Sequence, residues 1–306
     1  MNRHSGLVFD LIIRSRMHFH GKSDQVPLTT PPVYAKHSQG YTHATLIDRS
    51  TGSVHTGLSL NVLGPGGTIS PHLHSYEKGF YLLDGEVELS VADRCWRLVP
   101  GDFCALKVGT LHAWRNSAQR PARWLQMAAP QPKPFGQERD TFFAKHDADF
   151  SAAKPLDEND LNGALLGHFD ASQIPAGPAR DALPGMQGVF LKWLVDEKFG
   201  ARHHRLVFIQ YQPGASIALH DHTFEESYFL LSGEIEGIMD GKRYIARAGD
   251  VLWTGVGCVH TFTNIGNEPV RWLETFAPQP PAENVFRFMA EWEQRAKDLE
   301  APDLKT

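Results

Sequence analysis

Two absences narrow what this chain can be, because it has few cysteines and no long apolar run. Three cysteines without CxxC spacing argue against a disulfide framework and a zinc finger, and they favour a reducing cytoplasm. The apolar runs fall short of the roughly 18 residues that cross a membrane. The net charge is -5 and acidic and basic residues are intermixed along the chain, which argues against the basic surface that a nucleic-acid-binding protein normally has. We therefore expect a cytoplasmic globular protein that binds neither membrane nor nucleic acid.

The chain repeats itself without a gap, since 220 minus 72 and 260 minus 112 both give 148. At this offset the histidines of the two halves align, and "RWLQMAAPQP" (123–132) aligns with "RWLETFAPQP" (271–280). Each copy has the length of one ordinary domain. The segment 133–160 is polar, charged and flanked by prolines, as a linker should be. We therefore predict two domains, at 1–150 and 151–306.

Within each copy the apolar pattern is that of strands and short turns. Asp84-Gly85 predicts a turn, Asp240-Gly241 suits a tight hairpin, and turn residues recur at about the spacing of a β-sandwich or barrel. Apolar residues at helical spacing in 282–302 predict a C-terminal helix that packs on a barrel or a partner subunit. Residues 6–16 are apolar but contain Asp10 and precede no cleavage site, so they predict a strand or a subunit arm rather than a signal peptide.

The second copy has the residues of a metal site. His220 and His222 are two apart on a predicted strand, so their side chains leave the same face. Glu226 has the same parity, and His260 comes much later, at the end of "GDVLWTGVGCVH" (249–260). Three imidazoles and one carboxylate suit a divalent transition metal better than magnesium or calcium, and they leave open positions for a substrate.

These spacings resemble the two motifs of the cupin family. The first motif matches Gly214, His220, His222, Glu226 and Gly233, and the second matches Gly249, Gly257, His260 and Asn264. In the first copy the same motifs fall on Gly66, His72, His74, Gly85, Pro100, Gly101, Gly109, His112 and Asn116. The resemblance covers both copies and implies an all-β fold of two jelly-roll barrels (double-stranded β-helices), which is a bicupin with a C-terminal helix.

The first copy departs from the family pattern at one ligand position. His72, His74 and His112 are present, but Lys78 stands where the motif has a glutamate. An ammonium at about 4 Å repels a divalent ion by about 8 kcal/mol at an effective dielectric constant near 20, whereas neutralising the lysine at pH 7 costs about 4.6 kcal/mol. Three outcomes are open: an empty site in which Lys78 fills the hole and binds anions, a three-histidine metal site, or a neutral Lys78 that binds the metal or acts as a base. We expect the first, with one metal ion per chain, in the second copy.

The expected function is that of a metal-dependent enzyme acting on a small organic metabolite. A dioxygenase using Fe²⁺, Mn²⁺ or Ni²⁺ is favoured, with Zn²⁺ or Co²⁺ as other candidates and O₂ as co-substrate. Glu226 would be a metal ligand and also the catalytic carboxylate that takes up a proton. The alternatives are a non-oxidative isomerase, decarboxylase or lyase, in which the metal acts as a Lewis acid, and a non-catalytic binding module. We expect a homodimer, with a substrate pocket lined by Phe208, Gln210, Tyr228, Phe262 and Asn264.

Overall fold

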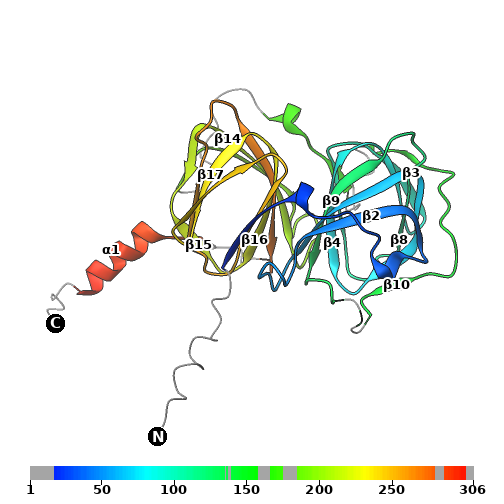
Figure 1. Cartoon of the computed structure of the whole chain (residues 1–306), viewed down its shortest axis with the longest axis horizontal. Coiled ribbons are helices and arrows are strands. Elements are labelled where there is room, and N and C mark those ends of the chain that lie inside the picture. The colour runs from blue at the N-terminus through cyan, green and yellow to red at the C-terminus, as the bar shows by residue number, and fades with distance from the viewer. Residues whose placement is uncertain are drawn as a thin grey trace, which may run out of the picture.

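The computed structural model describes residues 17–134, 136, 139–157, 166–174, 185–279 and 286–300. The expected arm at residues 6–16 lies outside them. Two curled eleven-stranded sheets lie side by side (Figure 1), which confirms the expected all-β bicupin fold. In the described part of the chain, no helix is long and apolar enough to cross a membrane.

The first barrel is built almost entirely from the first copy. Its strands are β2 (Ser38–Ile47), β3 (Gly57–His74), β4 (Glu77–Asp84), β5 (Val87–Val91), β6 (Arg94–Leu98), β7 (Asp102–Leu106), β8 (His112–Arg115), β9 (Ala122–Ala129), β10 (Thr141–Phe143), β11 (Lys154–Pro155) and β12 (Leu166–His168). Two short 3₁₀ turns precede β2, at Ser23–Gln25 and Pro32–Tyr34, and a third follows β12 at Ala171–Gln173.

The second barrel repeats this order and ends in a helix. Its strands are β1 (His18–Lys22), β13 (Met186–Val195), β14 (Arg205–Ile217), β15 (His220–His222), β16 (Glu225–Ser232), β17 (Glu234–Met239), β18 (Lys242–Arg247), β19 (Asp250–Thr254), β20 (His260–Thr263), β21 (Val270–Ala277) and β22 (Phe286–Phe288). The helix α1 (Met289–Glu300) begins later than the predicted 282–302, because Phe286–Phe288 instead pair as a strand with β15. The tight turn expected at Asp240-Gly241 is confirmed, with φ of 47° and 73°.

A strand near the start of each copy joins the barrel of the other copy. β1 pairs antiparallel with β19 of the second barrel, and β12 pairs antiparallel with β7 of the first. His20 Nε2 lies 3.0 Å from Asp250 Oδ2, and at the equivalent place His168 Nδ1 lies 2.7 Å from Asp102 Oδ1. The division of the chain at residue 150 stays a prediction, but the two copies are linked by this exchange of strands.

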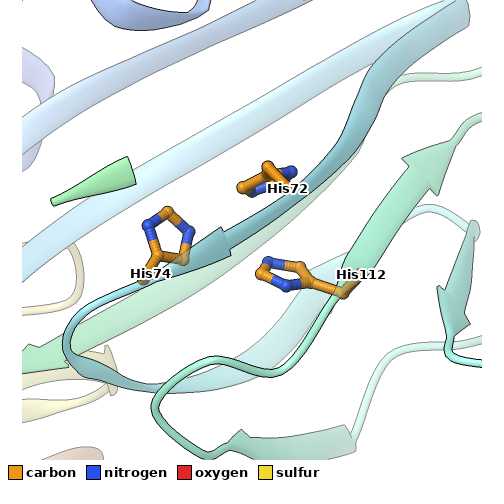
Figure 2. A group of neighbouring side chains, drawn as sticks. All are labelled: His72, His74 and His112. Atoms are coloured by element: carbon orange, nitrogen blue, oxygen red, sulfur yellow. The ribbon is translucent and has the colours of Figure 1, made fainter. Parts of the chain in front are cut away.

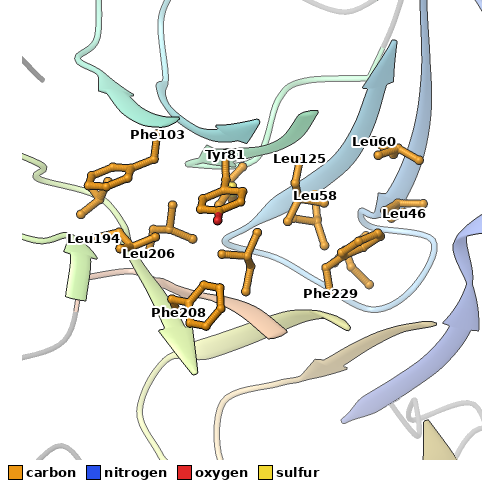
Figure 3. Close-up of a cluster of buried hydrophobic side chains, with 14 of the residues drawn as sticks. Leu46, Leu58, Leu60, Tyr81, Phe103, Leu125, Leu194, Leu206, Phe208 and Phe229 are labelled. Atoms are coloured by element: carbon orange, nitrogen blue, oxygen red, sulfur yellow. The ribbon is translucent and has the colours of Figure 1, made fainter. Parts of the chain in front are cut away.

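The largest apolar cluster lies between the barrels (Figure 3). Leu58, Tyr81 and Leu125 of the first barrel pack in one cluster with Leu206 and Phe208 of the second. In β3, β9 and β14, the alternate residues that face away from the barrel interior form this contact. Burial of apolar surface on this scale holds the two barrels together as one unit.

Two buried glutamates also join the barrels, and we call their interactions the reciprocal carboxylate contacts. Glu225 of the second barrel accepts hydrogen bonds from the Ser53 hydroxyl at 2.7 Å and from the backbone N–H groups of residues 54, 55 and 56 at 2.7, 3.0 and 3.3 Å. Glu77 of the first barrel accepts from the N–H of Arg202 at 2.9 Å and lies 2.7 Å from His204 Nδ1. Since Glu225 is the equivalent of Glu77, each barrel inserts the same residue into a loop of the other.

Candidate metal centre

The fold brings three histidines together in each barrel. The HxH pair lies on one strand, and the third histidine lies on an antiparallel neighbour, so that His220 pairs with His260 and His72 pairs with His112. In each trio the ligand nitrogens lie within 4.8 Å of one another. The two-residue spacing of each pair therefore acts as predicted and directs both rings to the same side of the strand.

Backbone carbonyls set the tautomers of the second-barrel histidines. The Nδ1 atoms of His220, His222 and His260 lie 2.8, 2.7 and 2.9 Å from the carbonyl oxygens of residues 218, 224 and 258. Because a carbonyl only accepts hydrogen bonds, each Nδ1 carries the hydrogen and each neutral ring keeps a lone pair on Nε2. This is the tautomer that a metal-ligating histidine needs, with the second nitrogen anchored.

Glu226 completes a set of four residues in the second barrel. Its Oε2 lies 2.9 Å from His222 Nε2 and 3.3 Å from His260 Nε2. Burial opposes ionisation of Glu226, but the positive charges and hydrogen bonds that His222 and His260 supply when they are protonated outweigh it and hold the pKa of Glu226 well below its usual value. A lone pair of His222 thus faces a carboxylate oxygen at contact distance, an arrangement that needs a proton or a cation between the two atoms.

Polar side chains lie beneath Glu226 on the barrel interior. The Tyr228 hydroxyl donates to Glu226 Oε2 and lies 3.1 Å from Thr254 Oγ1. Glu274 is also buried, and its Oε2 accepts from Trp272 Nε1 at 2.8 Å. Burial and the neighbouring Glu226 raise the pKa of Glu274 well above its usual value. Glu274 was not predicted as a site residue from the sequence. Its equivalent in the first copy is Gln126, so an acid without a counterpart on an interior strand was the signal that could have found it.

The first barrel also brings its three histidines together (Figure 2), two of them held by backbone carbonyls and His74 by the Thr141 hydroxyl, whose Oγ1 lies 3.0 Å from its Nδ1. Nδ1 of His72 lies 2.8 Å from the Ser70 carbonyl oxygen, and Nδ1 of His112 lies 2.9 Å from that of Thr110. Nε2 of both rings is buried and has no hydrogen-bond partner among the described residues. These two lone pairs therefore face the centre of the trio, as in the second barrel.

Lys78 occupies the place that Glu226 has in the second barrel. Its Nζ lies 3.0 Å from His74 Nε2, and the side chain is buried. Burial lowers the pKa of Lys78 to about 7. Burial, and to a lesser extent the positive charge of Lys78, lowers the pKa of His112 to about 3. The residues around Lys78 are apolar where the second barrel is polar, with Phe80 and Leu106 in place of Tyr228 and Thr254.

The structure places the residues of the predicted substrate pocket in different surroundings, and for Tyr228 and Phe262 the pocket stays a prediction. Tyr228 and Phe262 pack together beside the metal-ligand candidates, with ring centroids 5.1 Å apart. Phe208 and Gln210 were wrongly assigned to the pocket, because the alternate residues of β14 face the barrel interior. Phe208 instead packs between the barrels, and Gln210 accepts a hydrogen bond from Arg271 at 2.6 Å.

Asn264 was also wrongly assigned, because its amide group braces a turn. Its Nδ2 donates to the carbonyl oxygens of Tyr211 and Glu268, and its Oδ1 accepts from the N–H of Gly266. Asn116 makes the equivalent bonds in the first barrel, to the carbonyl oxygens of Leu63 and Arg120 and from the N–H of residue 118. This asparagine therefore serves the fold in both copies.

Comparisons with curated proteins find relatives that match short segments. An oxalate-binding protein of Thermotoga maritima is 40% identical over 62 residues, which are 20% of this chain and 51% of that protein. Polyketide synthase CurC of Streptomyces cyaneus is 31% identical over 78 residues, 24% of this chain and 51% of that protein. The chain thus spans about half the length of the curated relatives that it matches.

Solved structures that resemble this one cover nearly the whole chain. Oxalate decarboxylase of Lactobacillus farciminis, in complex with formate, has a TM-score of 0.64 and 16% identity, and the match covers 94% of both chains. The Bacillus subtilis oxalate decarboxylase with Mn(II) centres has a TM-score of 0.62 and 16% identity, over 94% of this chain and 85% of that one. At this identity the similarity establishes the fold alone. The Cupin domain family matches residues 59–127 and again 207–276. The chain therefore belongs to the cupin superfamily and is a bicupin, with one cupin domain in each barrel.

Proposed function

We propose that this protein is a metal-dependent enzyme that acts on a small organic acid in its second barrel, by non-oxidative chemistry. The observation that carries the proposal is the set of His220, His222, His260 and Glu226, in which lone pairs face one another at contact distance. Three anchored imidazoles and a carboxylate fit a divalent metal such as manganese, iron or nickel. When bound, such an ion supplies a Lewis acid for a carboxylate or enolate oxygen.

The named relatives and structural neighbours favour decarboxylation or a related lyase reaction over the dioxygenase chemistry preferred from the sequence. None of the four is named a dioxygenase, and three carry oxalate in their names. Decarboxylation replaces a C–C bond to the carboxylate with a C–H bond and releases CO₂, so it needs a proton and no net oxidant. Oxalate is therefore the first substrate to test, followed by other short carboxylic acids.

The surroundings of the second trio suit a small substrate. The Phe224 ring stacks on His222 at 4.1 Å, and the Phe286 ring of β22 lies 5.3 Å from His220. Such aromatic walls exclude water from the metal ligands, and the Tyr228 hydroxyl holds Glu226 in place.

The test combines metal analysis with two product measurements. Protein purified without added metal should hold divalent metal, and it should release CO₂ from oxalate without matching O₂ consumption. Glu226→Gln keeps the size of the side chain but removes its charge, and it should lose both the metal and the activity. Glu234→Gln, at an exposed ion pair with Arg247, is the matched control and should keep both. Stoichiometric O₂ uptake would restore the dioxygenase interpretation, and metal retained by Glu226→Gln would contradict the ligand assignment.

A non-catalytic binding protein is the second candidate, favoured by the 40% identity to an oxalate-binding protein over 62 residues. Calorimetry separates the two candidates, because a binding protein would take up oxalate with a finite affinity and release it unchanged. Metal-loaded protein that binds oxalate but yields no CO₂ would support this candidate.

A further inference from the structure

A cavity of about 850 Å³ lies in the first barrel, away from the second-barrel metal candidates. Its walls include inward-facing residues of neighbouring strands, among them His43 and Thr45 of β2, Ser59 of β3, and Gln126 and Ala128 of β9. The strand registers make this wall continuous, because Thr45 pairs with Ser59 and Ser59 pairs with Gln126. A space of this size is typical of sites for small organic ligands.

The inner end of the cavity reaches aromatic rings that touch the histidine trio. Tyr34 and Tyr76 line the cavity, and their rings lie 5.4 Å from His72 and 4.5 Å from His74, respectively. Lys78 is the register partner of Ala128 in the same sheet. The cavity therefore lies directly above the site where the lysine replaces the metal-binding glutamate.

The second barrel has no such wall, although its strands have the same register. At an offset of 148, the wall residues His43, Thr45, Ser59 and Ala128 become Leu191, Trp193, Val207 and Phe276. The pairings are equivalent, since Trp193 pairs with Val207 as Thr45 pairs with Ser59. The Trp193 and Phe276 rings lie 5.4 Å apart, and the Phe224 and Phe276 rings 4.9 Å apart. Bulky apolar side chains thus fill the second barrel where the first has small or polar ones.

Polar side chains of the wall are open to the cavity, since Thr45 is exposed and His43 and Gln126 are half-buried. The side chains of His43, Thr45 and Gln126 make no hydrogen bond to any described residue. Their donors and acceptors are therefore available to a ligand in the cavity.

The charges around the cavity favour an anion. Both acidic residues of the wall are already engaged, Asp48 by the N–H and hydroxyl of Ser50 and Asp140 by the N–H of Lys133. Arg49 and Arg139 also line the cavity, and neither has a carboxylate partner in the part of the chain that the structure describes. Free guanidinium groups suit a carboxylate, which they can bind with two hydrogen bonds.

We propose that the first barrel is a separate, metal-independent binding site for an organic carboxylic acid with an aromatic or apolar body. The acid group would face Arg49 and Arg139 at the rim, and the body would lie along the tyrosine-lined wall toward Tyr34 and Tyr76. The site goes beyond the proposed reaction, which concerns the second barrel, and it does not depend on the identity of the metal.

The internal repeat supplies the test variants. Ala128→Phe and Thr45→Trp introduce the residues that already occupy these positions in the second barrel, so each should fill the cavity with a side chain that the fold accommodates. Thr45 is exposed at the rim, which makes Thr45→Trp the safer change for folding. Circular dichroism and metal content should match the parent in both variants.

Benzoate and cinnamate are the probes, with benzyl alcohol as the uncharged match, and calorimetry gives the affinity. We expect the parent to bind at least one of the two acids, and both filling variants to weaken this binding by more than about tenfold. Replacing Arg49 and Arg139 together by glutamine should weaken the acids and leave benzyl alcohol unchanged. Glu226→Gln, which disables the second-barrel site, should bind the acids like the parent. Failure of the parent to bind either acid, undiminished binding by the filling variants, or loss of binding in Glu226→Gln would each overturn the proposal.

Discussion

The reciprocal carboxylate contacts make a strong prediction about how the barrels depend on each other. Glu225→Ala removes the acceptor of the Ser53 hydroxyl and of three consecutive backbone N–H groups. Ser53 and Thr56 can still bond each other, since the Ser53 hydroxyl lies 2.6 Å from the Thr56 carbonyl oxygen and accepts from the Thr56 N–H at 3.2 Å. The N–H groups of residues 54 and 55 lose the acceptor that Glu225 supplies, and Glu225 is buried, so water replaces these bonds only if the loop moves away. Loss of a buried, multiply hydrogen-bonded charge typically costs about 3–5 kcal/mol. We expect the free energy of unfolding to fall by about that amount.

Urea unfolding followed by fluorescence, together with metal content, measures both consequences. Glu225 neighbours Glu226 in β16, so loosening of this strand should also lower the metal content of the second barrel. Glu77→Ala should reduce stability similarly, since it removes the partner of His204, but should keep the metal, because Glu77 belongs to the first barrel. Glu234→Ala is the control, an exposed ion pair whose loss costs about 0–1 kcal/mol.

Two results would refute this reasoning. If Glu225→Ala unfolded at the same urea concentration as Glu234→Ala, the carboxylate would contribute nothing to the contact between barrels. If Glu77→Ala lost the metal as completely as Glu225→Ala, the effect would be general loosening of the protein rather than displacement of β16.

Three further predictions concern Lys78 and the exchanged strand. Lys78→Glu restores the four-residue set of the first barrel, so metal content should rise from about one ion per chain toward two; an unchanged content would show that the lysine is not what excludes the metal. Burial lowers the pKa of Lys78 to about 7, so between pH 7 and its ordinary value of 10.5 the unfolded chain binds more protons than the folded one. The free energy of unfolding should therefore rise with pH across this window, by at most about 1.4 kcal/mol per pH unit, and this contribution should be missing in Lys78→Met; equal pH dependence in urea titrations would contradict the shift. Removal of His18–Lys22 leaves one edge of β19 without its partner, so hydrogen exchange should accelerate in β19 and not in β7, which β12 covers; equal rates before and after removal would mean that β1 does not stabilise the second barrel.

The sequence was sufficient for the fold and for the meeting of the histidines, because both depend on local rules. The offset of 148 and the strand periodicity lead to two β-barrels, and the two-residue spacing of His220 and His222 directs both rings to one side. The turns at Asp84-Gly85 and Asp240-Gly241 were visible for the same reason, since glycine tolerates the positive φ that these turns need.

Phe208 and Gln210 were wrongly predicted to line the pocket, because the wrong set of alternate residues in β14 was assigned to the barrel interior. Successive side chains of a strand point to opposite faces, so shifting the assignment by one residue exchanges the two faces. In the structure Phe208 and Gln210 face away from the barrel interior, and Val207 and Ile209 face into it. The apolar pattern could not settle the choice, since both faces of β14 are buried, one in the barrel and the other between the barrels. The strand exchange was equally hidden, although the alignment of His20 with His168 was its trace in the sequence.

The two copies differ at the ligand position and agree at the position before it, and the structure gives a physical reason for both. Glu77 and Glu225 each accept several hydrogen bonds in a loop of the other barrel, so a change in either one damages the contact that both barrels share. Lys78 and Glu226 face the interior of their own barrels, so a change there affects one barrel only. The first barrel, in which Lys78 replaces the glutamate, also has the small and polar wall of the cavity where the second barrel has bulky apolar side chains. The same duplication that supplies two sites therefore leaves one barrel free to change its chemistry while the contact between the barrels keeps the other intact.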